Sequence, residues 1–592
     1  MKYLFTVPPF AISVIGVPQG IGIVATVAKN AGLEVYALVA KIYEPDSVYI
    51  ERLRYMIREQ KIDVVCIGAL STDYPRAKRI IDSASEEGCI TVLGGNIVSA
   101  SPELIATNIG ATYCVVGEGE YTFLELAEAL ESKRCTNDIN GLIYKDGNEL
   151  NTPPPRKVVD NLDTLPFIDG ELFQYQKYLE RSNTFHWILS RSCPFNCTFC
   201  FHAPDSYYRA KSIDYSFSEL DYYINQYGKH IKFLNIIDDM FNVNKNRMLE
   251  FCRRIKQYGI PFRVQTRLDF IDEECIITLK KAGCVILGVG VESASNKVLR
   301  SMNKKLTLHQ IKKGFKLAEK HEIIIDAQII IGDIADDLET IAESEKFFIE
   351  NFMLHDLQIH MIRVLPGTVL YKYAVRNELI KDELEFLEKD CPFINVSKIP
   401  NEIYRFLPYR YKNIMNGKYY MKSVPIDDQT PIFHLHKDGS FDFSAYCMTC
   451  YNRIYLKNTT LFSREAGQAR GSCPKCGVSQ YLLFFESLGI GSFDNDLLIS
   501  LSEKMFKDYK NKIIVIWGIN KRRIKRLLML SQTLRDCLVK IVDSNYEWIK
   551  DQTYCGLSIE SPDTLKNIKF DYLIITAEDR KMKSSQRWIL WA

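Results

Sequence analysis

Three cysteines stand close together in residues 190–204 of the chain. Cys193, Cys197 and Cys200 have the spacing C-x3-C-x2-C and follow a short apolar run. This spacing does not fit one face of a strand or one turn of a helix, so the sequence predicts a loop on which they converge at a metal centre. Thiolate ligands select zinc, Cu(I) or iron–sulfur. His202 could complete a four-ligand zinc site, whereas three cysteines alone would leave one iron of a [4Fe–4S] cluster open.

This stretch, including Phe199 before the third cysteine, resembles the cluster motif of the radical S-adenosylmethionine (SAM) enzymes. In that family the open iron binds the amino and carboxylate groups of SAM, and an electron from the cluster cleaves SAM to a 5′-deoxyadenosyl radical. The resemblance implies that Cys193, Cys197 and Cys200 are catalytic cluster ligands. A zinc site of three cysteines and one histidine and a fortuitous grouping are the alternatives.

A second group of cysteines lies farther along the chain. Two C-x2-C pairs, Cys447 with Cys450 and Cys473 with Cys476, are separated by 22 residues. They predict a zinc ribbon over residues 441–482, and four protein ligands would make the zinc structural, with no open position. Rubredoxin-type iron uses the same ligands and stays an alternative.

Length and composition limit the class of protein. The chain has 592 residues, 47% of them apolar, which is typical of a soluble protein of several domains. Its net charge of +2 gives no indication of nucleic-acid or anionic-membrane partners. No apolar run is long enough to predict a membrane span, and breaks in the first 25 residues argue against a signal peptide. The 17 scattered cysteines indicate a reducing cytoplasm and not a disulfide framework.

Residues 1–150 alternate apolar strands with helices, which predicts a doubly wound parallel sheet. Strands are expected at 2–7, 34–40, 63–68, 89–93 and 113–116, and helices at 21–31, 48–59, 77–87 and 121–132. Ligands of such sheets bind at the carboxyl ends of the strands. Polar residues and glycines follow three of these strands, at 71–73, 94–96 and 117–120. Ordinary helix caps and turns would also explain them.

This region resembles the cobalamin-binding domain that precedes the radical domain in B12-dependent radical SAM enzymes. The likeness lies in Pro8-Pro9, in Pro18-Gln19-Gly20, in the glycine pair and in GEGE followed by Thr122-Phe123. It implies cobalamin contacts at Gln19, Gly20, Ser71, Thr72, Gly94, Gly95, Gly117, Glu118, Gly119 and Glu120. The motif D-x-H-x-x-G is absent, so the lower face of a bound corrinoid should lack a protein histidine.

A methylthiotransferase would instead carry a second cluster in this domain. Cys66, Cys89 and Cys114 are the candidates, but each stands within or at the start of a predicted strand. Cysteine in such positions behaves as a small buried hydrophobe. We therefore expect these three to be core residues.

A linker is expected over 151–180, and a second series of strands and helices over 181–371. Six strands are expected, the first starting at residue 187 and the others at 233–237, 262–266, 285–291, 323–331 and 356–364. This count predicts a partial (β/α)6 barrel, in which functional groups collect at the C-terminal strand ends. From the family resemblance, SAM contacts are expected at Phe199, Arg209, Asp238, Asp239, Gln265, Arg267, Glu292 and Ser293. An apolar backbone edge at 329–332 would suit the adenine.

The rest of the chain is less informative. Residues 372–440 are expected to be an extension that helps to close the active site. Residues 505–592 have the strand–Gly–helix–strand–Asp order of a Rossmann-like domain but lack G-x-G-x-x-G. A scaffold or interaction role is favoured there over nucleotide binding at its basic helix.

Together these patterns predict an α/β multidomain chain: a B12-dependent radical SAM enzyme that uses a [4Fe–4S] cluster, SAM and cobalamin and contains structural zinc. C-methylation of an unactivated carbon is the expected reaction. The substrate would be a small or carrier-bound molecule, and a flavodoxin or ferredoxin the reductant. Radical cyclisation or oxidative rearrangement, loss of cobalamin, and a non-enzymatic metal-binding assembly role are the alternatives.

Overall fold

The computed structural model describes residues 1–9, 17–40, 44–203, 205–352, 355–408 and 410–411, together with short segments between 434 and 590. The chain divides into two compact units, residues 1–418 with 472–478, and residues 419–471 with 479–592. No helix of the described residues is long and apolar enough to cross a membrane.

The first unit begins with a seven-stranded sheet in the order β2-β1-β3-β4-β5-β6-β7. The first five strands are parallel: β1 (Lys2–Thr6), β2 (Glu34–Leu38), β3 (Val64–Gly68), β4 (Ile90–Gly94) and β5 (Tyr113–Val115). The predicted doubly wound sheet is therefore present, and β1 and β3 flank the point where the strand order reverses. Two antiparallel strands that we did not predict, β6 (Leu142–Asp146) and β7 (Glu149–Asn151), extend it.

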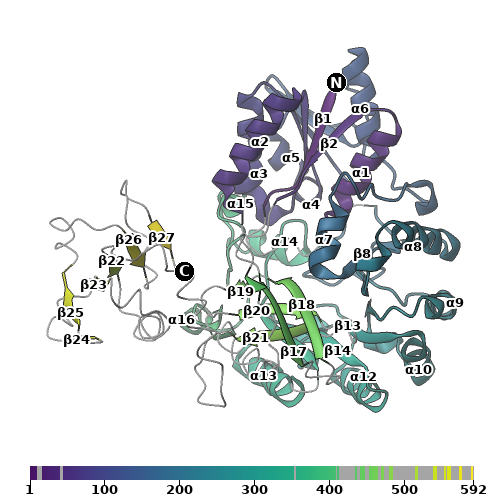
Figure 1. The fold of residues 1–592 in the computed structure, drawn as a ribbon, viewed down its shortest axis with the longest axis vertical. Helices are drawn as coiled ribbons and strands as arrows, with labels where there is room; N and C mark the ends of the chain where they lie inside the picture. Colours follow the sequence, from purple (N-terminus) through teal and green to yellow (C-terminus); the bar gives the residue numbers. More distant parts are fainter. Residues whose placement is uncertain are drawn as a thin grey trace. The chain divides into compact units, whose positions relative to one another are not determined.

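Helices cover both faces of this sheet. Figure 1 shows α2 (Asp46–Gln60) and α3 (Tyr74–Glu86) on one side and α1 (Gln19–Asn30) and α6 (Glu120–Ser132) on the other. Two short helices, α4 (Asn96–Ala100) and α5 (Pro102–Asn108), were not predicted. They are too short for an apolar period to appear, and extended backbone at Ser101 separates them.

Cys66, Cys89 and Cys114 are buried, with exposures of 2%, 7% and 0%. Burial also raises the pKa of each thiol. The expectation of core cysteines is confirmed.

A second sheet contains six parallel strands in chain order, as predicted: β8 (Thr184–Trp187), β11 (Phe233–Ile236), β12 (Phe262–Thr266), β13 (Cys284–Glu292), β14 (Ile324–Ile331) and β15 (Asp356–Met361). This arrangement fits a partial barrel. The first strand ends at Trp187, where we expected it to begin. The backbone leaves the sheet there because the N–H groups of Leu189 and Ser190 donate to Asp238 Oδ1, at 2.6 and 3.1 Å, and not to a neighbouring strand.

A helix directly precedes this sheet in the chain, further helices follow its strands, and a small two-stranded ribbon lies next to the cysteine loop. The helices are α7 (Tyr175–Ser182), α8 (Ile213–Tyr227), α9 (Lys245–Ile255), α10 (Glu273–Ala282), α11 (Asn296–Ser301), α12 (Leu308–Lys320) and α13 (Leu338–Asn351). The ribbon pairs β9 (Ser190–Arg191) with β10 (Arg209–Ala210) antiparallel.

The segment after β15 packs against the N-terminal sheet. It contains α14 (Val369–Arg376), α15 (Glu383–Glu388) and α16 (Asn401–Tyr404). Buried Leu370 and Phe386 belong to the same apolar core as Leu53 and Val98 of the first domain. One continuous core therefore joins this segment to the N-terminal domain.

The second unit contains antiparallel pairs, including β17 (Phe441–Tyr446) with β18 (Arg453–Thr459), and a largely parallel six-stranded sheet. In that sheet β22 (Ile514–Trp517) lies between β23 (Leu538–Val542) and β26 (Tyr572–Ile575), which fits the predicted Rossmann-like domain. Cys447, Cys450, Cys473 and Cys476 lie outside the described residues, as do Gly518 and the basic helix, so the zinc ribbon stays a prediction.

Candidate active site

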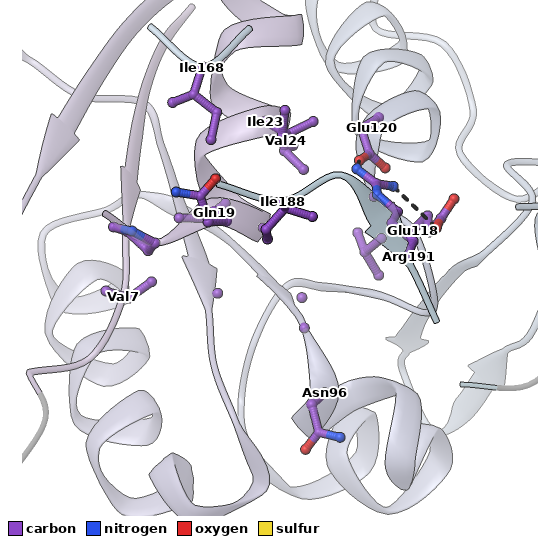
Figure 2. Close-up of a pocket in the computed structure, with 18 of the residues that line it drawn as sticks. Val7, Gln19, Ile23, Val24, Asn96, Glu118, Glu120, Ile168, Ile188 and Arg191 are labelled. Carbon is purple, nitrogen blue, oxygen red and sulfur yellow. Dashed lines mark hydrogen bonds and ion pairs between the residues drawn. The ribbon is translucent and has the colours of Figure 1, made fainter. Parts of the chain in front are cut away.

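A cavity of about 600 Å³ lies within the first unit, at the carboxyl edge of the N-terminal sheet (Figure 2). The ends of β1 and β3 contribute Phe5, Val7 and residues 66–70 to its wall. The opposite wall comes from the start of the second sheet and includes Ile188, Arg191 and Asp239. One cavity is therefore bounded by both domains of the unit.

The N-terminal wall contains most of the residues predicted to contact cobalamin. Gln19, Gly20, Gly94, Gly95, Gly117, Glu118, Gly119 and Glu120 all line the cavity. Ser71 and Thr72 are not among the lining residues, and the Ser71 hydroxyl donates to Asn96 Oδ1 at 3.0 Å. Gly95 has a φ of +98°, and a Cβ there would lie 2.6 Å from the Ala69 carbonyl oxygen. Only glycine fits that close turn.

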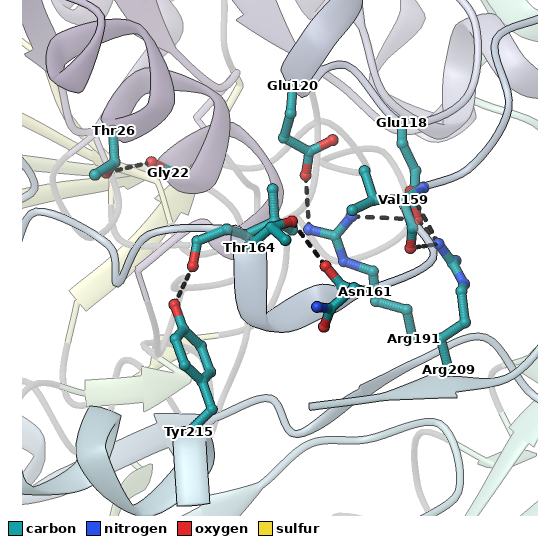
Figure 3. A network of polar contacts seen from close by, with 11 residues as sticks. Gly22, Thr26, Glu118, Glu120, Val159, Asn161, Thr164, Arg191, Arg209 and Tyr215 are labelled. Carbon is teal, nitrogen blue, oxygen red and sulfur yellow. Dashed lines mark hydrogen bonds and ion pairs between the residues drawn. The ribbon is translucent and has the colours of Figure 1, made fainter. Parts of the chain in front are cut away.

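Four buried or half-buried charges join the two walls (Figure 3). Arg191 contacts Glu120 Oε1 at 2.6 Å and Glu118 Oε1 at 3.2 Å. Arg209 donates to both oxygens of Glu118, at 2.8 and 3.0 Å, and to the Val159 carbonyl at 2.7 Å. Burial would raise the pKa of Glu118, but the hydrogen bond from Arg209 and the charge of Arg191 outweigh it, and the pKa is lowered. Glu118 is therefore a carboxylate at neutral pH.

The cavity wall fits a large amide-bearing ligand such as cobalamin. Its glycines permit close backbone approach, and apolar side chains form much of the rest. Glu120 is 3% exposed, and its Oε2 is a buried acceptor without a partner in the described part of the chain. An amide N–H entering the cavity would satisfy such an acceptor.

The cysteine loop is held in place by elements from elsewhere in the barrel domain. Thr198 donates its N–H to the Met302 carbonyl at 3.0 Å, and Leu370 donates to the Thr198 carbonyl at 2.9 Å. The Asn303 side chain donates to the Asn196 carbonyl at 2.7 Å. These contacts fix the middle of the loop, at residues 196–198.

The structure brings the cysteines of this loop only partly together. Among the described residues, no three His, Cys, Asp or Glu side chains gather around one point. A hydrogen bond from Cys200, supported by the charge of Lys304, lowers the pKa of the Cys197 thiol. Burial raises the pKa of the Cys193 thiol, and the hydrogen bond with Cys197 raises that of Cys200. A thiolate is the form that binds iron.

A buried ion pair stands near these cysteines. Lys304 Nζ lies 2.7 Å from Glu292 Oε1, and the two residues are 7% and 8% exposed. Burial alone would lower the pKa of Lys304, but the facing Glu292 carboxylate outweighs it and the pKa is raised. Glu292 has a φ of 62°, which is rare outside glycine. A Cβ at Gly290 would overlap both Glu292 Oε1 and Lys304 Nζ, so the glycine permits the pair.

The remaining predicted SAM residues divide into two kinds. Asp239 is exposed and lines the cavity, in a position to meet a ligand. Asp238 is 3% exposed and its Oδ1 is taken up by the backbone of the first strand end. Burial raises the pKa of Asp238 to about 6.

Several others already have protein partners. Arg267 binds Asp269 through two hydrogen bonds of 3.0 and 2.9 Å and stacks on Phe195. Gln265 accepts from Arg263 at 2.9 Å. The Ser293 hydroxyl lies 3.2 Å from that of Ser344. Phe199 packs against the apolar core, and Arg209 contacts Glu118 of the other domain, as described above.

Sequence reasoning missed two charged residues of this site, Arg191 and Lys304. Arg191 immediately precedes the cysteine loop, and that proximity was the available signal. Lys304 stands in an ordinary-looking basic run, so nothing in its local sequence indicated that it is buried beside Glu292.

Comparison with known proteins identifies both domains. Residues 187–346 match the radical SAM superfamily, and residues 11–127 match the B12 binding domain. The chain is thus a radical SAM enzyme that carries a B12-binding domain. SAM, a [4Fe–4S] cluster and cobalamin are the cofactors of these two domains, and the residues described above fit them.

Individual relatives agree with this class. An uncharacterized methyltransferase of Pyrococcus horikoshii is 29% identical over 64% of this chain and 84% of its own length. An anaerobic magnesium-protoporphyrin IX monomethyl ester cyclase of Rubrivivax gelatinosus is 26% identical over 50% of this chain and 56% of its own length.

Solved structures share the fold. The radical SAM methyltransferase TsrM of Kitasatospora setae, with tryptophan and a SAM analogue bound, has a TM-score of 0.54 at 18% identity. It covers 63% of this chain and 76% of its own length. The same enzyme is also known with cobalamin and a [4Fe–4S] cluster bound.

Proposed function

We propose that this protein is a B12-dependent radical SAM methyltransferase that methylates an unactivated carbon of a small or carrier-bound substrate. The observation that supports this most strongly is the single cavity between the B12-binding edge and the barrel rim. When bound, the cluster with SAM supplies a 5′-deoxyadenosyl radical and cobalamin supplies a methyl group. The two cofactors must act on one substrate, so both must reach one space.

The residues of the chain would divide this work. Cys193, Cys197 and Cys200 hold the cluster from a loop fixed at its middle. Glu292 and Asp239 supply carboxylates at the barrel rim, and the Glu292 carboxylate is kept in place by Lys304. These groups can accept hydrogen bonds from the ammonium or the ribose hydroxyls of SAM. The glycine-rich wall admits the corrinoid, and the apolar walls exclude water from the reacting centre.

Radical cyclisation or oxidative rearrangement is the second candidate reaction. The likeness to the Rubrivivax protein, which is named a cyclase, favours it. Both reactions require the same reduced cluster, so we propose a flavodoxin or ferredoxin as reductant in either case. The four cysteines of residues 441–482 are proposed to hold structural zinc.

The test is anaerobic reconstitution of the full chain with iron, sulfide, hydroxocobalamin and SAM. We expect about four cluster irons and about one cobalt per chain, and 5′-deoxyadenosine after reduction with dithionite. A deuterated methyl group from SAM should then reach a product when candidate substrates are added. Iron without cobalt would remove methylcobalamin from the proposal, and an absence of deoxyadenosine would remove radical chemistry.

A further inference from the structure

The charged network between the two walls connects two specific parts of the chain. Both carboxylates come from the junction of β5 and α6, which forms part of the cavity wall: Glu118 lies in the turn and Glu120 is the first residue of α6. Both arginines come from the ribbon of β9 and β10, whose strands precede and follow the cysteine loop. Figure 3 shows Arg191 reaching Glu118 and Glu120, with Arg209 on the other side of Glu118.

Arg191 has a direct link to the cluster loop. It is the last residue of β9 and stands two residues before Cys193. Ser192, between them, has a φ of 66°, so the backbone turns sharply at this point. Because β9 pairs with β10 at Arg191 and Arg209, the two arginines and both ends of the loop belong to one ribbon.

The network is also sensitive to the contents of the cavity. The side chains of Glu120 and Arg209 are only 4% and 3% exposed, and those of Glu118 and Arg191 are about one-fifth exposed at 19% and 23%. Buried charges stabilise a protein only when their partners lie in good hydrogen-bonding geometry. Glu120 Oε2 lacks a partner in the described residues. A hydrogen-bond donor that enters the cavity would therefore bind this carboxylate and fix its position.

From this geometry we propose that Arg191 is a positioning residue that couples occupancy of the corrinoid cavity to the order of the cluster loop. A corrinoid fixes the turn that bears Glu118 and Glu120, Arg191 and Arg209 transmit this to the ribbon, and the loop of residues 192–203 becomes more ordered. Linkage requires that an assembled cluster tighten corrinoid binding by the same factor by which bound corrinoid favours cluster binding. This inference rests on the proposed function only for the identity of the group in the cavity.

The first experiment measures the Kd of hydroxocobalamin for the full chain with and without the reconstituted cluster. In the wild type we expect the cluster to tighten binding by about fivefold or more, the lower range of known couplings. In Arg191→Gln the two Kd values should agree within about twofold. Equal Kd values in the wild type, or an unchanged ratio in Arg191→Gln, would overturn the proposal.

Arg156→Gln is the matched control. Arg156 also fixes α6, through the Thr122 hydroxyl at 2.8 Å and through Glu125, and its side chain is 18% exposed. It contacts neither Glu118 nor Glu120 by any described hydrogen bond or ion pair, so the variant should keep the wild-type ratio. Loss of the ratio in this control would mean that general loosening of α6, and not Arg191, carries the effect.

A second experiment needs no substitution. Hydrogen exchange of the peptide over residues 190–203 is measured in cluster-free wild-type protein, with and without hydroxocobalamin. We expect slower exchange when corrinoid is bound, and unchanged exchange at saturation would refute the coupling even if Arg191→Gln does not fold. Absence of corrinoid binding in every form would refute the proposed function as well, whereas binding without coupling would refute only this inference.

Discussion

The carboxyl edges of the two sheets in the first unit differ in composition. The edge of the N-terminal sheet presents glycines and backbone, with Gly94, Gly95, Gly117 and Gly119 on its surface. The edge of the second sheet presents charges held in pairs, such as Glu292 with Lys304 and Arg267 with Asp269. A glycine surface accepts a large ligand by shape, whereas fixed charges orient a small zwitterion such as SAM. Substitutions at the two edges should therefore impair different functions: corrinoid binding at the glycine edge and SAM cleavage at the charged edge.

Loss of a cluster ligand should have the largest effect, and the effect should fall mainly on cluster chemistry, with corrinoid binding weakened only by the loss of the proposed coupling. Cys197→Ala removes a buried thiol of the loop, so cluster iron and 5′-deoxyadenosine should fall to background while hydroxocobalamin still binds. The assay is deoxyadenosine after dithionite reduction. Cys135→Ala, at an exposed free cysteine, is the control and should behave as wild type. Deoxyadenosine at wild-type levels from Cys197→Ala would contradict the assignment of the loop.

A methyl group at Gly290 should damage the charged edge. The new Cβ would displace the Glu292 carboxylate and Lys304, and a misplacement of about 1 Å near the chemistry can cost about 10²-fold in rate. We expect Gly290→Ala to lower deoxyadenosine formation by about that factor with the cluster intact by its visible spectrum. Wild-type turnover would show that the Glu292–Lys304 pair has no role in SAM cleavage.

The opposite result is expected at the glycine edge. Gly95→Ala forces a Cβ to within 2.6 Å of the Ala69 carbonyl in a left-handed backbone, so the wall of the cavity must shift. The Kd for hydroxocobalamin should rise about tenfold, with cluster content and uncoupled deoxyadenosine formation largely retained. If Gly95→Ala and Gly290→Ala lower both readouts equally, the two edges do not have separate functions.

The smallest effect should appear at Asp238. Substitution of this residue tests whether its carboxylate has a structural role or binds a ligand. Burial raises its pKa from 3.8 to about 6, so the folded chain binds this proton more tightly than the unfolded chain. Stability from this group is therefore present at low pH and is lost as pH rises through about 6. Asp238→Asn can still accept from Leu189 and Ser190, so it should remove this pH dependence and stabilise the protein at pH 7 by about 1–3 kcal/mol.

The measurement is thermal unfolding of cluster-free protein between pH 4.5 and 7.5, together with deoxyadenosine formation by the reconstituted variant. Asp239→Asn is the comparison, because Asp239 lines the cavity and its substitution should lower activity. Inactive but folded Asp238→Asn would show that Asp238 contacts SAM after all.

Much of this architecture could be predicted from the sequence because local pattern determines it. Buried strands are continuous apolar or alternating runs, and the bounds of one of them, Phe262–Thr266, were predicted without error. The glycine-rich turns could be placed at one edge because parallel strands end together. Helices such as Asn96–Ala100 are too short to show the apolar period of a helix. The two antiparallel strands after residue 141 showed no clear apolar pattern.

Partners in space were harder to predict than positions in the chain. Asp238 and Asp239 are adjacent, yet one holds the backbone of the first strand end and the other lines the cavity. Arg209 was expected near SAM and instead contacts Glu118, 91 residues away in the chain. Such pairings depend on how two domains pack, and a single sequence contains no local record of that.

The central claim is that cobalamin and the cluster meet in one cavity of the first unit. The most direct test is the electron paramagnetic resonance spectrum of cob(II)alamin bound to the full chain, recorded with the cluster oxidised and then reduced. We predict that reduction broadens the cob(II)alamin signal by magnetic coupling, and that the broadening is absent in Cys197→Ala. An unchanged cob(II)alamin signal, with both cofactors at full occupancy, would contradict the shared cavity.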